Sequence, residues 1–261
     1  MEVHHPHGHH GPRKGKEYLL EFLMLFAAVS LGFLAENLRE GFIERHRSHE
    51  LALALRTDVQ QDVEKVKALI INRGEVLLAT KLAVNDVEKN GFKRADVIQY
   101  RNLLRSAYYW SYFEPTTANL DQIINSGSLR YFKNKDLIKA VSNYRNLINV
   151  VESRNEREKQ YFYDVMQPMV INYLNLSPMD TTHFTGTITP KDFFYKIDSG
   201  LINIKTKDLV LFDNSPANRF KILNAYRSFS VNLSNTIRIS SKPFLEEAEH
   251  LIELLNNELE E

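Results

Sequence analysis

The N-terminal tail carries the residues with the clearest capacity for metal chemistry. Five histidines crowd residues 1–16, a segment that is also rich in Gly and Pro: His4, His5, His7, His9 and His10. Clustered imidazoles bind zinc, nickel or copper. A Gly- and Pro-rich segment fixes no ligand geometry, so we expect a disordered tail with loose, incidental metal affinity. The sequence predicts no resident cofactor, and a metal-sensing tail is the alternative.

Other candidates for chemistry are sparse. His46 and His49 lie three residues apart beside Glu50, on one helix face, but would need metal ligands from elsewhere. No P-loop, GxGxxG, HExxH or GxSxG motif occurs. The 261-residue chain contains no Cys, which excludes disulfides, thiolate nucleophiles and Cys-ligated zinc. We therefore expect a protein that is not an enzyme.

Aromatic side chains form a second cluster, in the run AYYWSYF. They are Tyr108, Tyr109, Trp110, Tyr112 and Phe113. The run ends a predicted helix from Ala95, and Pro115 disfavours helical geometry at the residue before it. The cluster cannot all face one core, so part of it is a candidate surface for a ligand, a membrane or a partner. The alternative is an aromatic core corner between helices.

An apolar run near the N-terminus predicts a transmembrane helix over residues 17–36. The 18 residues from Tyr18 to Ala35 are interrupted only by Glu21, Ser30 and Gly32, and as a helix they span about 27 Å. A buried core helix and a cleaved signal peptide are the competing interpretations. Signal cleavage after Ala35 fits poorly, because it would place Phe33 where a small residue is preferred.

One stripe of this span favours helix association. Glu21, Ala28, Gly32 and Ala35 lie close to one line along the helix, and small residues there let a second helix approach. A carboxyl group on the same stripe prefers a partner to lipid. We expect a homo-oligomer or a complex with another membrane protein. The alternative is that Glu21 reaches the headgroups.

Charge patterning bears on partners and orientation. Lys plus Arg and Asp plus Glu are equal at 33 each, so nothing indicates nucleic acid binding. Basic residues precede and follow the span in similar numbers, but those of the short tail lie closer to it. The positive-inside rule thus favours a cytoplasmic N-terminus and a main domain outside the inner membrane, in the periplasm.

The remaining chain, residues 37–261, predicts an all-α domain. A long amphipathic helix continues from the span to Asn90, and further helices follow Asn134 and Ser215-Pro216. The charged run 152–160 suggests a solvated helix face, and residues 177–215 a loop-rich insertion in which residues 201–212 could form a short hairpin. Pro115, Thr116 and Gly127 predict a structural turn. An antiparallel helical bundle joined to the membrane helix would bury each apolar stripe.

Two stretches carry a resemblance to a known group. The start, MEVHHPH followed by KEYLLEFLMLFAAVSLGFLAENLRE, and the segment 113–144, FEPTTANLDQIINSGSLRYFKNKDLIKAVSNY, resemble uncharacterised bacterial single-span membrane proteins with a His-bearing tail. The resemblance implies one span and a helical domain behind it, and it transfers no catalytic residue. We expect a membrane-anchored interaction or scaffold protein of the cell envelope. The alternative is an extracytoplasmic sensor-type domain that binds a ligand and signals through a partner.

Overall fold

The computed structural model describes residues 15–92, 97–175, 195–196, 199, 211 and 213–260. Within these ranges the chain is all-α, as predicted, and the only strand-like pairing is an isolated bridge between Leu174 and Leu211. In chain order the elements are α1 (Gly15–Asn90), α2 (Val97–Ala107), α3 (Ala118–Asn125), the 3₁₀ turn η1 (Ser128–Tyr131), α4 (Lys135–Tyr161), the π-helical turn η2 (Phe162–Met166), α5 (Gln167–Tyr173), α7 (Pro216–Thr236), the π-helical turn η4 (Ile237–Ser241) and α8 (Lys242–Glu260).

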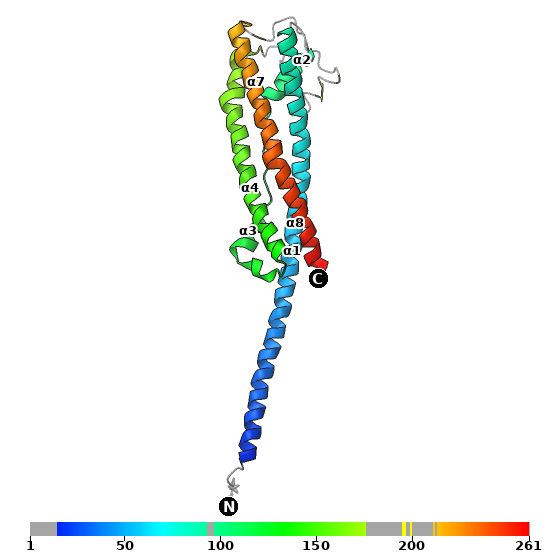
Figure 1. The fold of residues 1–261 in the computed structure, drawn as a ribbon, viewed down its shortest axis with the longest axis vertical. Helices are drawn as coiled ribbons and strands as arrows, with labels where there is room; N and C mark the ends of the chain where they lie inside the picture. The colour runs from blue at the N-terminus through cyan, green and yellow to red at the C-terminus, as the bar shows by residue number, and fades with distance from the viewer. Residues whose placement is uncertain are drawn as a thin grey trace, which may run out of the picture. The chain divides into compact units, whose positions relative to one another are not determined.

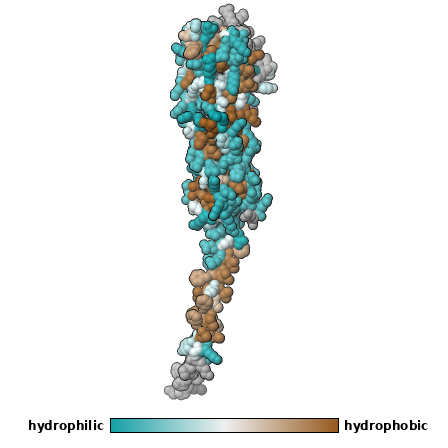
Figure 2. All heavy atoms as spheres, in the orientation of Figure 1, coloured by the Kyte–Doolittle hydropathy of each residue, from teal (hydrophilic) through white to brown (hydrophobic). Residues whose placement is uncertain are grey.

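The chain divides into two units, Met1–Leu51 and Ala52–Glu261. In the first unit the described residues all belong to α1. Apolar side chains cover most of this segment, as Figure 2 shows. The predicted tail lies mostly before residue 15, so its histidines fall outside the described residues.

Contacts between distant residues fix the helix directions in the second unit. Successive α1 residues meet partners in reverse order on α7 and α8, and in the same order on α4. The pairs are Arg56–Asn256, Lys67–Glu249 and Glu88–Arg227 for α7 and α8, and Asp62–Tyr144 and Arg73–Glu158 for α4. α1 and α4 therefore run parallel to each other, and α7 and α8 run antiparallel to both (Figure 1).

The segment that comprises α2 and the chain following it is only partly helical. α2 runs back along α1, where Ser106 bonds Thr80, and the chain then continues without helix through Tyr108–Thr117, a segment that we term the strap. Further along, Thr116 binds Asp62 of α1, which lies 18 residues before Thr80. The ten residues from Ser106 to Thr116 therefore span about 27 Å along α1, which requires a nearly extended backbone. The prediction of a helix from Ala95 to Phe113 was therefore wrong at its end.

Local signals set the other helix boundaries as predicted. Asn134 caps α4, because its Oδ1 accepts hydrogen bonds from the backbone N–H groups of Asp136 and Leu137 at 2.9 and 3.3 Å. Ser215 caps α7, with Pro216 in its first turn. Gly127 adopts φ +70° before η1, a conformation that glycine adopts without strain.

Large side chains fill the core of the second unit. The largest fully buried ones include Tyr100, Tyr144, Tyr226 and Phe244. The Tyr226 hydroxyl donates to the backbone oxygen of Leu103 at 2.8 Å, so its polar end is satisfied inside the core. The predicted insertion at 177–215 and the hairpin at 201–212 lie almost entirely outside the described residues.

Candidate functional site

The first unit contains the candidate membrane span. Tyr18–Ala35 forms part of α1, and its apolar window is 0% buried. α1 is, within the described ranges, a helix long and apolar enough to cross a membrane. The stripe of Glu21, Ala28, Gly32 and Ala35 is exposed, and a Cβ added at Gly32 would meet no atom within 4 Å. The stripe is therefore open to a second helix.

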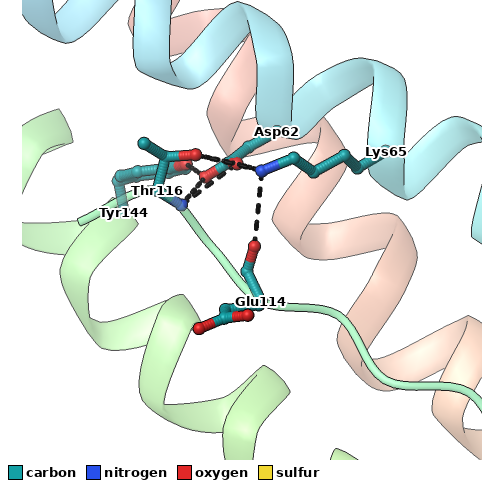
Figure 3. A network of polar contacts seen from close by, with 5 residues as sticks. All are labelled: Asp62, Lys65, Glu114, Thr116 and Tyr144. Atoms are coloured by element: carbon teal, nitrogen blue, oxygen red, sulfur yellow. Dashed lines mark hydrogen bonds and ion pairs between the residues drawn. The ribbon is translucent and has the colours of Figure 1, made fainter.

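In the second unit a buried carboxylate organises the most connected polar cluster, drawn in Figure 3. Asp62 is fully buried and accepts hydrogen bonds from the Thr116 backbone N–H at 2.9 Å, the Thr116 hydroxyl at 3.0 Å and the Tyr144 hydroxyl at 2.9 Å. The ammonium of Lys65 lies 3.1 Å from Asp62 and contacts the backbone oxygen of Glu114 at 3.4 Å. The cluster thus joins α1, the strap and α4.

These contacts follow from the shape of the strap. A helix satisfies its own backbone groups, whereas an extended segment in a bundle must find partners elsewhere. Asp62 and Lys65 bind the strap at Thr116 and Glu114, and Asn155 of α4 donates to the Phe113 backbone oxygen at 2.7 Å. The contacts of Asp62 therefore hold α1, the strap and α4 together.

A second buried cluster lies at Arg73. Its guanidinium binds the Glu158 carboxylate at 3.1 Å and the Ser241 hydroxyl at 3.0 Å, and both side chains of the ion pair are almost fully buried. Arg73 Nε, Glu158 Oε1 and Asn155 Oδ1 are buried without a hydrogen-bond partner. A buried pair of this kind adds little net stability, because the cost of desolvation offsets the attraction, but removal of one partner leaves an uncompensated charge.

Both π-helical turns lie next to this ion pair. η4 ends at Ser241, which binds Arg73, and η2 begins four residues after Glu158. A π turn inserts one extra residue and rotates the side chains that follow it. At the end of η4 Ser240 and Ser241 are buried, and the next buried side chain is Phe244 of α8.

The structure separates the five aromatic residues. Phe113 is 2% exposed and packs edge-on against Phe244 with ring centroids 5.2 Å apart, so this residue forms the core corner. Trp110 packs on Phe162, 6.5 Å between centroids, but stays partly exposed. Tyr112 is 58% exposed. An extended strap places neighbouring side chains on opposite sides, which explains why adjacent aromatics differ in burial.

Burial perturbs several tyrosines around these clusters. Burial raises the pKa of Tyr144, and the neighbouring Asp62 carboxylate raises it further. Burial also raises the pKa values of Tyr226 and Tyr109. These phenols stay protonated at neutral pH and act as hydrogen-bond donors, as the Tyr144 and Tyr226 contacts show.

The structure offers little for metal or ligand binding among the described residues. His46 pairs with Glu50 at 3.2 Å on the exposed face of α1, and no group of three metal-binding side chains is found there. Two open surface grooves are present, one between α1 and α8 around Lys67 and Glu249, the other beside α7 around Lys221 and Arg227. Neither contains Asp62, Arg73 or the strap aromatics.

Sequence reasoning missed the central residues of both clusters. The charged run 152–160 was interpreted as solvated, which is wrong for Asn155 and Glu158, because they are 1% and 5% exposed. Asp62 gave a usable signal, since it recurs at helical spacing within the apolar stripe of α1. Of the three residues predicted to form a turn, Pro115 and Thr116 lie in the strap and Gly127 precedes η1 with φ +70°, and Thr116 is the strap's attachment to Asp62.

Comparison with known proteins adds no assignment: no protein-family model, curated protein or solved structure matches the chain.

Proposed function

We propose that this protein is a non-catalytic, membrane-anchored scaffold or interaction protein of a bacterial cell envelope, of the single-span type that its sequence resembles. The supporting observation is the continuity of α1. Its first part exposes an apolar length suited to a bilayer, and its later part supplies the buried face of the bundle. The polar groups of the Asp62 cluster hold structural elements together, and the two surface grooves are open.

Localisation is the first test. Full-length protein is expected in the membrane pellet after an alkaline carbonate wash and in the supernatant only after detergent. Release by carbonate alone contradicts an integral anchor. The chain has no native Cys, so single-Cys variants report orientation. A membrane-impermeant maleimide on spheroplasts should label Asn143→Cys, while Glu2→Cys should react only after permeabilisation. The reverse pattern would place the bundle in the cytoplasm.

A ligand-sensing domain is the second candidate, favoured by one observation. Arg73, Asn155 and Glu158 each bury a polar atom without a hydrogen-bond partner, and one unpaired donor with two unpaired acceptors could bind a small polar solute. A ligand that binds only the folded state raises its melting temperature. A thermal-shift screen of amino acids and small organic acids tests this candidate. A shift that persists in Arg73→Met would exclude this site.

A further inference from the structure

The corner that joins α3 to α4 carries an unbalanced positive charge. Residues 118–145 contain five lysine and arginine residues but only two carboxylates, in a chain whose formal net charge is zero. One carboxylate, that of Asp121, is paired with Arg145 at 2.9 Å. Four basic residues of this segment are exposed, and we term them the basic corner: Arg130, Lys133, Lys135 and Lys139.

The three lysines of the basic corner are not neutralised within the chain. Lys133, Lys135 and Lys139 have no ion-pair partner among the described residues. The second carboxylate, that of Asp136, lies in the first turn of α4, where an acidic residue interacts favourably with the helix N-terminus. The basic corner therefore presents its positive charge to the surroundings of the second unit.

The basic corner lies at the end of the second unit that contains Ala52, the first residue of that unit. α4 runs parallel to α1, and the Tyr144 hydroxyl of α4 bonds Asp62 of α1 at 2.9 Å. Lys135 precedes Tyr144 by nine residues, so it lies level with about residue 53 of α1, because both helices rise by about 1.5 Å per residue. Ala52 follows Ala35, the end of the candidate span, by 17 residues. As helix, this tether is about 26 Å long.

The acidic end of α8, with the sequence ELEE, lies at the same end of the unit but against another side of α1. Asn119 of α3 donates to Asp58 of α1 at 2.8 Å. Asn256 of α8 accepts from Arg56 of α1 at 3.1 Å. Residues two apart on a helix point about 200° apart, so α3 and α8 contact different sides of α1, as Figure 1 shows. The unit thus has a basic flank at α3 and α4 and an acidic flank at the end of α8.

We propose that the basic corner docks on the anionic headgroups of the membrane that holds the span, so that the second unit leans towards its α3 flank. An anionic bilayer attracts lysine and arginine side chains, and the attraction falls off within a Debye length of about 8–10 Å. The same surface repels the acidic flank. Transmembrane helices tilt by up to about 40°, which lowers one flank of a tethered domain towards the surface.

Two observations favour lipid over an acidic protein as the occupant. The tether keeps the basic corner near the membrane at all times, which raises the effective concentration of headgroups. Tyr131 lies beneath the Arg130 guanidinium, 5.1 Å from its carbon to the ring centroid, and tyrosine is enriched at membrane–water interfaces. The proposal rests on the proposed function, because the span supplies the tether.

Fluorescence quenching of the full-length protein in lipid nanodiscs tests the lean. The chain has no native Cys, so a single fluorophore is attached at Asn125→Cys, exposed at the end of α3, or at Asn257→Cys, exposed near the end of α8. The probe is a phospholipid with a nitroxide on its headgroup. In phosphatidylglycerol discs, quenching at Asn125→Cys should exceed that at Asn257→Cys severalfold. The difference should vanish in phosphatidylcholine discs or at high salt.

Charge variants identify the residues responsible. Quenching at Asn125→Cys should fall to the level of Asn257→Cys in a triple variant of the basic corner: Lys133→Gln, Lys135→Gln and Lys139→Gln. A matched control removes three exposed lysines from other parts of the second unit and should leave the quenching unchanged: Lys81→Gln, Lys89→Gln and Lys221→Gln.

Several outcomes overturn the proposal. Equal quenching at the two positions, or quenching that does not depend on lipid charge, means that no directed docking occurs. An unquenched label at Asn125→Cys means that the corner faces water or, if the free thiol is shielded from maleimide in native membranes, that an acidic protein covers it.

Insertion into the discs keeps this result apart from the proposed function. A chain that inserts but does not lean retains the anchor and removes the docking. A chain that fails to insert contradicts the anchor. Lysine-dependent pelleting of that chain with phosphatidylglycerol vesicles would still support the basic corner as a lipid-binding surface, and failure to pellet would overturn it as well.

Discussion

Substituting Arg73 by Met should destabilise the folded domain strongly. The change leaves the Glu158 carboxylate in an interior where its side chain is 4% exposed and where Oε1 already lacks a partner. Removing one member of a buried ion pair costs about 3–5 kcal/mol, because the remaining charge has no compensation. For a domain of about 200 residues, each kcal/mol corresponds to about 2–4 °C. The melting temperature should therefore fall by roughly 6–20 °C.

A matched control exists on the same helix. Lys67 pairs with Glu249 of α8 at 2.9 Å, but both side chains are about half exposed. An exposed pair contributes about 0–1 kcal/mol, since water and salt screen it. Lys67→Met thus removes the same charge type from α1 with little expected loss. The difference between the two variants isolates burial as the cause.

Helical circular dichroism during thermal unfolding in detergent micelles is the assay. The double variant Arg73→Met with Glu158→Leu removes both charges and should recover most of the loss, because apolar residues of similar size can replace a buried pair. Two results would refute the reasoning. One is an equal effect of Arg73→Met and Lys67→Met. The other is a double variant as unstable as the two single losses added together.

Three further outcomes are expected. Asp62→Ala leaves the hydrogen-bond donors of Thr116 and Tyr144 unsatisfied and should lower the free energy of unfolding by about 2–4 kcal/mol. It should also red-shift the fluorescence of Trp110, the only tryptophan. Unchanged emission would show that the strap stays in place. Gly127→Ala should cost about 1–2 kcal/mol at its positive φ, whereas Gly74→Ala within α1 should stabilise by about 0.5–1 kcal/mol, both measured by urea unfolding. Because burial raises the pKa of Tyr226 in the folded state, stability should decline as pH rises above about 10; tyrosinate absorbance from this residue that appears before helix is lost would contradict this.

Interactions within a few residues made part of the fold predictable. The C-terminal end of α1 and the caps of α4 and α7 depend on local signals at Asn90-Gly91, Asn134 and Ser215. The strap depends instead on Asp62, which lies 54 residues before Thr116. The helical propensity of the residues before Pro115 gave no sign that contacts with Asp62 would compete with helix formation. Tertiary hydrogen bonds and the burial of Phe113 in the core favour the extended strap over a longer helix.

The candidate clusters were harder to predict for a related reason. A charged residue on a helix is normally solvated, and only its neighbours in space reveal an exception. Glu158 lies 85 residues from Arg73, within a run of nine mostly charged residues. Its burial becomes understandable once α1 and α4 are known to run parallel, because Asp62–Tyr144 and Arg73–Glu158 then occupy successive levels of one interface.

The exposed apolar side chains of the first part of α1 support its proposed location in a bilayer on energetic grounds. Residues 18–35 expose about a dozen large apolar side chains, each about 50–70% accessible. Full burial of such a side chain is worth about 1.5–3 kcal/mol. Transfer of the whole segment from water into apolar surroundings is therefore favourable by roughly 20–35 kcal/mol. Whole domains are stable by only about 5–15 kcal/mol. A partner helix would cover one side of this segment, yet its apolar residues occupy every side, which is typical of a helix surrounded by lipid.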